Sequence, residues 1–370
     1  MSINKSLISQ LLKNTLCLLF FAFGISSFVH AQKINGISFG GPSECYYIID
    51  MFEELKTSNA TWDALIPETE MDRSTLELLP DEKSKYWSTT IEANIQFIHL
   101  AKHAGLKVFL KPHLVLGDPI KKRKLPKAVF TNNTLSTNEE FVIDKTKGAE
   151  WRGDLELKKE SDWKILEAQY EAYILELATV AQTLEVDLFS VGTELKQFAI
   201  KRPQFWKQLI QKVRAIYTGP LTYAANWDEY DKITFWQELD YIGVDTYFPI
   251  NKTKTPTISK TLRNWKAIQR QLKKWSKKEN RQILLTEFGY RNIPYAGKRP
   301  WTHDKGKITT LNNEAQVNLY EAFFQTFWEQ PWVAGGFSWR WFSHTITDKD
   351  TSFSVQNKPA LAVLQKWYEQ

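Results

Sequence analysis

The chain contains only two cysteines in 370 residues, Cys17 and Cys45. If the first 31 residues are removed during export, as argued next, Cys45 alone remains and no disulfide can form within one chain. Stability must then come from buried apolar side chains, and a chain of this length can bury a large core.

Long apolar runs are also scarce. The run Leu16–Val29 has 14 residues, is interrupted by one glycine and two serines, and is therefore short for a membrane span. Two lysines precede it, and Val29–Ala31 offers the small residues that a signal peptidase reads. We predict a cleaved signal peptide over residues 1–31 and an exported protein, periplasmic or extracellular, with no membrane span after cleavage. A retained membrane anchor is the alternative.

The chain has little excess of charge. Two of its 48 basic residues and none of its 42 acidic residues lie in the first 31 positions, so the remainder has a net charge of +4. Such a weak field argues against nucleic acid or a membrane surface as a partner.

Tryptophan, by contrast, is abundant, with 15 residues. Its large apolar face and single donor suit stacking against sugar rings, although a tryptophan-rich core is the simpler explanation. Several tryptophans follow predicted strands, which favours the sugar-binding interpretation.

Apolar strand segments and helical segments alternate eight times after residue 33. Strands are expected at 34–39, 61–67, 107–111, 187–191, 221–225, 241–244, 282–286 and 333–339, and helices at 44–57, 89–104, 162–184, 203–217, 233–239, 259–278, 312–329 and 359–368. The second helix should begin with a capping box of Thr89 and Glu92 and end at Gly105.

This alternation predicts an α/β fold, a single (β/α)8 TIM barrel over residues 32–370. An open doubly wound sheet is the alternative, but Gly40-Gly41-Pro42 is not the glycine-rich phosphate turn that such a sheet usually carries.

A long loop of about 45 residues, 117–161, follows the third predicted strand. Loops of this length inside a compact domain are usually functional. We expect Trp151, near its end, to fold over the mouth of the barrel.

The carboxyl ends of parallel barrel strands meet at one rim. The polar and aromatic residues expected there are Lys111 and His113 after strand three, Thr193 and Glu194 after strand four, Asn226 and Trp227 after strand five, Asp245 and Tyr247 after strand six, Glu287 at strand seven, and Trp339 and Trp341 at strand eight.

Glu194 and Glu287 each end a compact apolar run. A carboxylate at the end of a buried strand is costly unless the site uses it. We expect strands four and seven to lie on opposite sides of the barrel, so that the two acids face each other. Paired carboxylates of this kind are typical of glycoside hydrolysis, in which one acid is kept neutral and the other ionised.

Six stretches resemble a known group of enzymes. They are Ser190-Val-Gly-Thr-Glu-Leu195, Leu239-Asp-Tyr-Ile-Gly-Val-Asp-Thr-Tyr247, Leu285-Thr-Glu-Phe-Gly-Tyr-Arg291, Asn313-Glu-Ala-Gln-Val-Asn-Leu-Tyr320, Gly335-Gly-Phe-Ser-Trp-Arg-Trp341 and Phe353-Ser-Val-Gln-Asn-Lys-Pro-Ala-Leu361. The chain resembles clan A of the retaining glycoside hydrolases, and within it family 113, known for β-1,4-mannanase activity. The resemblance runs from about Ile34 to Trp367.

The resemblance implies that Glu194 is the acid/base and Glu287 the nucleophile. It also implies that Tyr247 hydrogen-bonds the nucleophile and that Trp339 forms the floor under the sugar. Much of the clan has asparagine immediately before the acid/base, contacting the sugar 2-hydroxyl, whereas this chain has Thr193.

Simpler roles stand beside these assignments. The two glutamates can be structural acids paired with Lys111 or Arg291. Asp245 can bind substrate or cap the following loop, and His113 can touch substrate or only hydrogen-bond the rim. Trp227 and Trp341 can stack on sugars at neighbouring subsites or pack against adjacent loops. Asn226 is our candidate to replace the contact that Thr193 weakens.

The sequence thus predicts a retaining hydrolase of β-1,4-mannosidic linkages in mannan or manno-oligosaccharides. It needs no metal or organic cofactor, and we expect a monomer whose partner is the polysaccharide. The alternatives are a clan A enzyme acting on glucan, galactan or xylan, and a non-catalytic carbohydrate-binding barrel.

Overall fold

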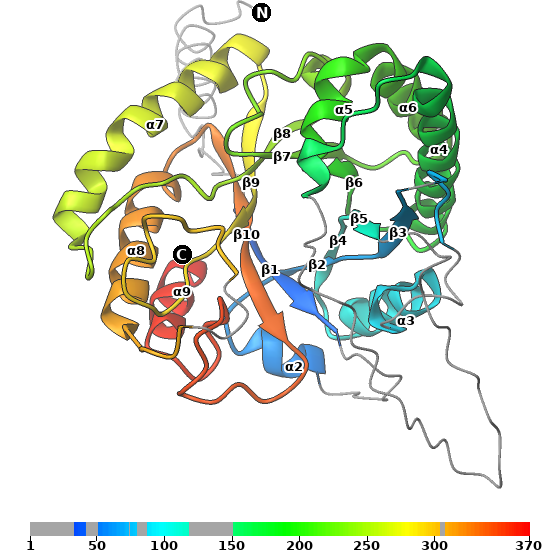
Figure 1. Cartoon of the computed structure of the whole chain (residues 1–370). Coiled ribbons are helices and arrows are strands. Elements are labelled where there is room, and N and C mark those ends of the chain that lie inside the picture. Colours follow the sequence, from blue (N-terminus) through cyan, green and yellow to red (C-terminus); the bar gives the residue numbers. More distant parts are fainter. Residues whose placement is uncertain (1–32, 42–50, 74, 80–86, 118–150, 304–307) are drawn as a thin grey trace, which may run out of the picture. The chain divides into compact units, whose positions relative to one another are not determined.

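Eight of the apolar runs form strands that pair in parallel and close into a barrel (Figure 1). The computed structural model describes residues 33–41, 51–73, 75–79, 87–117, 151–303 and 308–370. The barrel strands in spatial order are β1 (Ile34–Gly40), β10 (Val333–Phe342), β9 (Gln282–Phe288), β8 (Tyr241–Asp245), β7 (Leu221–Asn226), β6 (Leu188–Thr193), β4 (Lys107–Leu110) and β2 (Trp62–Leu65). The predicted (β/α)8 TIM barrel is confirmed. The signal peptide and most of the long loop lie outside the described residues.

Helices follow the strands and cover the outside of the barrel (Figure 1). They are α2 (Met51–Lys56), α3 (Ile91–His103), α4 (Glu160–Thr183), α5 (Lys196–Lys201), α6 (Pro203–Ile216), α7 (Ile258–Glu279), α8 (Asn313–Phe327) and α9 (Ala360–Tyr368), with 3-10 turns η2 (Trp87–Thr89), η4 (Arg152–Asp154) and η5 (Trp236–Glu238). The described part of the first predicted helix is α2. The predicted short helix at 233–239 is only the single turn η5, and α5 is an addition that the sequence did not predict.

The second predicted helix begins one residue later than its capping signal suggested. Thr89 belongs to the turn η2, and Thr90 is the N-cap of α3, where its hydroxyl accepts a hydrogen bond from the Ala93 amide at 3.1 Å. The predicted capping box of Thr89 and Glu92 is therefore wrong, because the preceding 3-10 turn shifts the start of the helix. The predicted end is right, since Gly105 has the left-handed φ of +80° that suits glycine after a helix.

Two short strands that the sequence did not predict lie beyond the ends of β2 and β4. β3 (Glu68–Asp72) pairs in parallel with β5 (His113–Gly117), and His113 stands opposite Glu68. This small sheet extends the wall of the barrel above its rim and places His113 at the start of a strand.

Tryptophan fills much of the layer between barrel and helices. Trp206, Trp236 and Trp265 are completely buried there, each packed against other aromatic rings. Packing in the core therefore explains these three tryptophans, and the sugar-binding interpretation applies to the tryptophans at the rim. Among the helices that the structure describes, none has the length and apolar character needed to cross a membrane.

Candidate active site

Glu194 directly follows β6 and turns out of the strand. Its backbone has φ +55°, a left-handed conformation that is uncommon for a residue with a side chain, while its amide still donates to the Ala224 carbonyl of β7 at 2.8 Å. The turn brings the Glu194 side chain to the rim, where it is 12% exposed to solvent.

Glu287 lies near the end of β9 and is 7% exposed at its side chain. Its Oε1 pairs with the buried ammonium of Lys111, and its Oε2 accepts a hydrogen bond from the Tyr247 hydroxyl at 2.8 Å. The Tyr247 contact is the one that the resemblance implied. The ion pair with Lys111 is the one that the simpler, structural role of Glu287 predicts. It offsets the charge of Glu287 at the rim.

Arg152 and His113 connect the two carboxyl groups. Nη2 of Arg152 lies 3.3 Å from Oε2 of Glu194 and 3.3 Å from Nδ1 of His113. Nε2 of His113 lies 3.7 Å from Oε1 of Glu287. The two glutamates thus belong to one cluster of side chains at the rim, although they come from strands far apart in the sequence.

Trp151 reaches the same carboxyl of Glu194. Its indole Nε1 donates to Oε2 at 3.3 Å. The ring folds back over Gly153, where a Cβ would stand 2.2 Å from it, so a larger residue there would displace the Trp151 ring. The end of the long loop therefore reaches the carboxyl of Glu194 at the rim.

Electrostatics give the cluster an asymmetry. Burial raises the pKa of Glu194, and the charge of Glu287 raises it further, whereas Arg152 and the Trp151 hydrogen bond act against the shift. Burial and the neighbouring cations Arg152, Lys111 and Arg340 hold the pKa of His113 well below its ordinary value, so His113 is neutral at neutral pH. A carboxyl with a raised pKa is suited to donate a proton.

Asp245 is completely buried at the end of β8, beside Glu287 in the strand register. Its Oδ1 accepts a hydrogen bond from the Thr286 hydroxyl at 2.7 Å, and burial raises its pKa well above the usual range, with the charge of Glu287 adding to the effect. Its observed contact is with the barrel wall rather than with a helix terminus.

Thr193 faces away from the cleft. It is 1% exposed, and its hydroxyl donates to the Pro112 carbonyl at 3.0 Å. Asn226 is half-buried, and its side-chain oxygen accepts a hydrogen bond from the Trp227 amide at 2.9 Å. Because Thr193 is buried and its hydroxyl proton is already engaged, we expect the contact to a sugar 2-hydroxyl to come from another side chain.

The two tryptophans of β10 differ in role. Trp339 is half-buried and lies parallel to the His113 ring, with centroids 6.1 Å apart, under the ammonium of Lys111. Trp341 is buried in the core, which fits the packing role. Trp227 is half-buried and stacks on Trp301 with ring centroids 5.5 Å apart.

One geometric prediction was wrong. The shorter way around the barrel from β6 to β9 passes only β7 and β8, so the two glutamates do not come from opposite strands. They belong to one cluster because the left-handed turn at Glu194 and the arch formed by Arg152 and His113 connect them.

Sequence reasoning missed several charged groups of the rim. Arg340 lies over Trp339, 5.4 Å from the ring centroid, and both it and Arg152 lower the pKa of Glu68, which burial raises. Glu229 is completely buried behind Glu194. The signal that could have found Arg152 and Arg340 is adjacency, because each follows a tryptophan already assigned to the rim.

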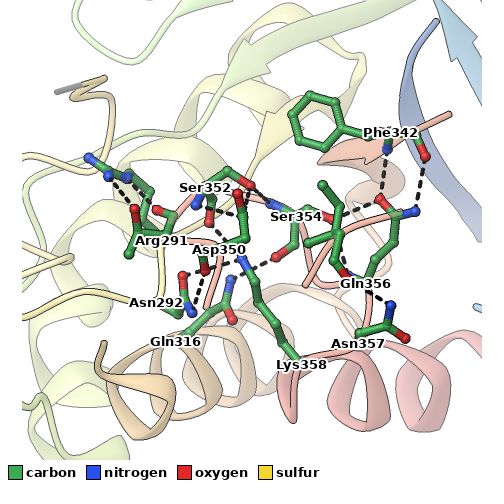
Figure 2. A network of polar contacts seen from close by, with 12 residues as sticks. Arg291, Asn292, Gln316, Phe342, Asp350, Ser352, Ser354, Gln356, Asn357 and Lys358 are labelled. Atoms are coloured by element: carbon green, nitrogen blue, oxygen red, sulfur yellow. Dashed lines mark hydrogen bonds and ion pairs between the residues drawn. The ribbon is translucent and has the colours of Figure 1, made fainter. Parts of the chain in front are cut away.

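A second polar network holds the segment after β10, residues 343–359, beside this rim. Figure 2 shows Gln356 bound to both backbone groups of Phe342, accepting from the amide at 2.7 Å and donating to the carbonyl at 2.9 Å. The buried ammonium of Lys358 contacts Asp350 at 2.9 Å and Asn292 at 3.3 Å.

This network also accounts for Arg291 and supports Tyr247. Arg291 donates to the Thr351 carbonyl at 2.7 Å, while Glu287 is paired with Lys111. Phe353, carried by the same segment, packs edge-on against Tyr247 with centroids 6.1 Å apart. The 343–359 segment therefore supports the hydroxyl that binds Glu287.

Comparison with known sequences and structures agrees with this geometry. The sequence pattern of Glycoside Hydrolase Family 113 matches residues 142–358, more than half of the chain. The chain belongs to glycoside hydrolase family 113. No curated protein matches the sequence. Membership makes this protein a glycoside hydrolase with a carbohydrate substrate.

The solved structures that it resembles include members of family 113. A GH113 β-mannanase from Alicyclobacillus acidocaldarius has a TM-score of 0.74 at 20% identity, covering 91% of this chain and 97% of the other. A GH113 β-1,4-mannanase has a TM-score of 0.69 at 21% identity, covering 92% and 99%. A β-glucuronidase from Ruminococcus gnavus is similar at a TM-score of 0.56 and 16% identity, and the present chain spans 50% of it. At these identities the likeness supports the fold.

Within the described residues, no group of three or more histidine, cysteine, aspartate or glutamate side chains is arranged to hold a metal ion.

Proposed function

We propose that this family 113 protein hydrolyses β-1,4-mannosidic linkages in mannan or manno-oligosaccharides with retention of configuration. The observation that carries the proposal is the asymmetric pair of carboxyl groups: Glu194 has a raised pKa, and Glu287 is held by a cation and a tyrosine hydroxyl. One acid is suited to donate a proton and the other to attack. The titles of the similar family 113 structures support mannan as the substrate.

The proposed reaction has two steps. Glu194 protonates the departing glycosidic oxygen while Oε2 or Oε1 of Glu287 attacks the anomeric carbon, which forms a glycosyl-enzyme ester and releases the shortened sugar. Glu194, now ionised, then takes a proton from water, and the water oxygen displaces Glu287. Lys111 and Tyr247 hold the nucleophile, and Trp339 offers its ring face to the sugar.

Two variants test the roles. We expect Glu194→Gln to lower kcat on manno-oligosaccharides about 10²–10⁴-fold, which is the usual contribution of a positioned general acid. Glu287→Gln should lose at least as much, because no ester can form. Circular dichroism must show both variants folded. A mechanism-based inactivator should label Glu287, and the first product seen by proton NMR should be the β-anomer. An α-anomer would contradict retention.

A second substrate class is favoured by one observation. Mannose and glucose differ at the 2-hydroxyl, and the Thr193 hydroxyl that precedes the acid/base is engaged by Pro112. A clan A activity on glucan, galactan or xylan is therefore the rival proposal. Reducing ends released from mannan, carboxymethylcellulose, galactan and xylan, measured side by side, separate the two. Binding of these polymers without any release would favour a non-catalytic barrel.

The proposal includes export, on the basis of the signal-like first 31 residues. Protein recovered from the periplasm or the medium should begin at position 32, which mass spectrometry of the N-terminal peptide would show.

A further inference from the structure

The backbone turn at Glu194 is held by hydrogen bonds on both sides. A residue other than glycine in the left-handed region costs about 1–2 kcal/mol, so the surrounding structure must enforce the conformation. On one side the Glu194 amide donates to Ala224 at 2.8 Å. On the other side the amide of Leu195 donates to the hydroxyl of Tyr223, also at 2.8 Å. A side chain of β7 thus replaces the backbone partner that β6 loses when it turns.

The Tyr223 hydroxyl can accept this bond because its own proton is used elsewhere. It donates to Oε1 of Glu229 at 3.1 Å, and this fixes the orientation of the hydroxyl lone pairs toward Leu195. The Tyr223 ring cannot swing away, since it packs edge-on against Trp206 and Phe235 with centroids 5.3 and 5.6 Å away.

Glu229 has no evident part in binding substrate. It is completely buried in the turn after β7, where its amide donates to the Asn226 carbonyl at 3.0 Å. Burial, with the charge of Glu194 adding to it, raises its pKa to about 8. A buried carboxyl is expensive, and its carbonyl oxygen can accept the tyrosine proton whether the group is neutral or ionised.

We propose that Tyr223 and Glu229 are positioning residues for the acid/base: Glu229 orients the Tyr223 hydroxyl, which holds the Leu195 amide and with it the left-handed turn that aims the Glu194 carboxyl at the cleft. This inference rests on the proposed role of Glu194. It assigns a positioning function to the hydrogen bonds that join the Leu195 amide, the Tyr223 hydroxyl and the Glu229 carboxyl.

A misaimed acid has a specific kinetic signature. Protonation of the leaving oxygen matters most for a sugar, matters less for the more acidic p-nitrophenol, and hardly matters for 2,4-dinitrophenol, which is more acidic still. The test compares kcat/KM, which reports the step that breaks the glycosidic bond, on p-nitrophenyl and 2,4-dinitrophenyl β-mannosides or mannobiosides. We expect Tyr223→Phe to lower kcat/KM about 10–100-fold on the first and less than about 3-fold on the second.

Tyr217→Phe is the matched control. Tyr217 is a buried tyrosine whose hydroxyl donates to a backbone carbonyl, Val186, at 2.7 Å, just before the opposite end of β6. Loss of the Tyr217 hydroxyl should destabilise the fold to a similar degree. It should lower kcat/KM equally on both substrates or leave both values unchanged. A Tyr223→Phe variant with equal losses on both substrates, or with none, would overturn the proposal.

Two variants of Glu229 keep the test decisive if Tyr223→Phe does not fold. Glu229→Leu removes the acceptor and should show the same dependence on the leaving group. Glu229→Gln keeps an acceptor oxygen and should show a smaller dependence. Equal behaviour of the two variants would contradict the proposed orientation of Tyr223. Failure of the underlying function is distinguishable, because the wild-type protein would then hydrolyse neither substrate.

Discussion

At the scale of single residues, the environment of Glu194 decides what the acid can do. Its pKa is raised by burial and by Glu287, and Arg152 counteracts this shift from 3.3 Å away. In the proposed bond-breaking step Glu194 acts in its protonated form, so we expect kcat/KM to fall as the pH rises through its pKa. The position of that basic limb therefore reports the balance between these neighbours.

We expect Arg152→Met to move the basic limb of kcat/KM to higher pH, because the variant loses the cation that lowers the pKa of Glu194. Arg152→Lys keeps a positive charge and should move the limb less. The measurement is a pH profile of kcat/KM on a manno-oligosaccharide. A limb that stays in place, or moves to lower pH, would show that Arg152 does not set the protonation of Glu194.

The stacked pair Trp227 and Trp301 gives a second prediction at this scale. Trp301 is 41% exposed, and Trp227 beside it packs on Phe248 with centroids 5.7 Å apart. Trp227 follows β7, the neighbour of the strand that Glu194 follows, so we expect the pair to lie on the side of the rim from which the sugar would leave.

Trp301→Ala should raise KM about 5- to 10-fold for long manno-oligosaccharides and leave the shortest substrate unchanged, since one aromatic contact is worth roughly 1 kcal/mol. Tyr295→Ala, an exposed aromatic of the same loop, is the control. An equal rise of KM for every chain length would exclude a distal sugar platform.

At the scale of elements, the sequence predicted each barrel strand and the long helices because their periodicity is local. It missed β3 and β5, since they pair with each other outside the barrel, and β3 also bridges to Leu78, so that their pairing depends on the paths of the loops. It also missed α5, because six residues between Leu195 and Arg202 carry too little pattern. The stretch from Phe353 to Leu361 resembles the family, and Figure 2 shows what its polar side chains do: Gln356 binds Phe342 at the end of β10, and Lys358 binds Asp350.

Lys358→Met should destabilise this segment. The side chain of Lys358 is fully buried and that of Asp350 is 30% exposed, so breaking the pair should cost about 1–3 kcal/mol at pH 7. Hydrogen bonds from Ser352 and Lys358, together with the charge of Lys358, outweigh burial and lower the pKa of Asp350. The contribution is therefore present above the unfolded pKa of about 4 and lost as the pH falls through the lowered value.

Thermal unfolding at pH 7 and pH 3 checks this prediction. The variant should unfold at a lower temperature than the wild type at pH 7, and the difference should shrink at pH 3. Lys366→Met, which removes an exposed lysine paired with Glu321, should change little at either pH. A difference that is the same at both pH values would mean that the Asp350 charge is not involved.

At the scale of the whole molecule, the barrel carries buried carboxyls that do not belong to the cleft. Asp63 on β2 is completely buried, and burial raises its pKa well above the usual range, with only the Ala64 backbone acting against it. Because the folded protein holds this proton more tightly than the unfolded chain, the stability from Asp63 is fully present below about pH 4 and declines as the pH rises.

Asp63→Asn should therefore raise the unfolding temperature relative to the wild type, and more at pH 8 than at pH 4. Asp231→Asn, at an exposed position, should leave both temperatures close to wild type. If the Asp63→Asn variant were less stable at pH 8, Asp63 would have to be a paired, ionised group.

The sequence by itself determined the alternation of strands and helices, the closed barrel and the two glutamates at strand ends, because these follow from periodicity and from the rule that carboxyl ends share one rim. Only the tertiary structure decided which side chains of the rim contact one another. Arg152 reaches Glu194 across 42 residues of chain and Tyr223 reaches Leu195 across 28. The turn at Glu194 is left-handed although no glycine marks it in the sequence. Charge and hydrogen bonding act through space, and a linear pattern records only neighbours along the chain.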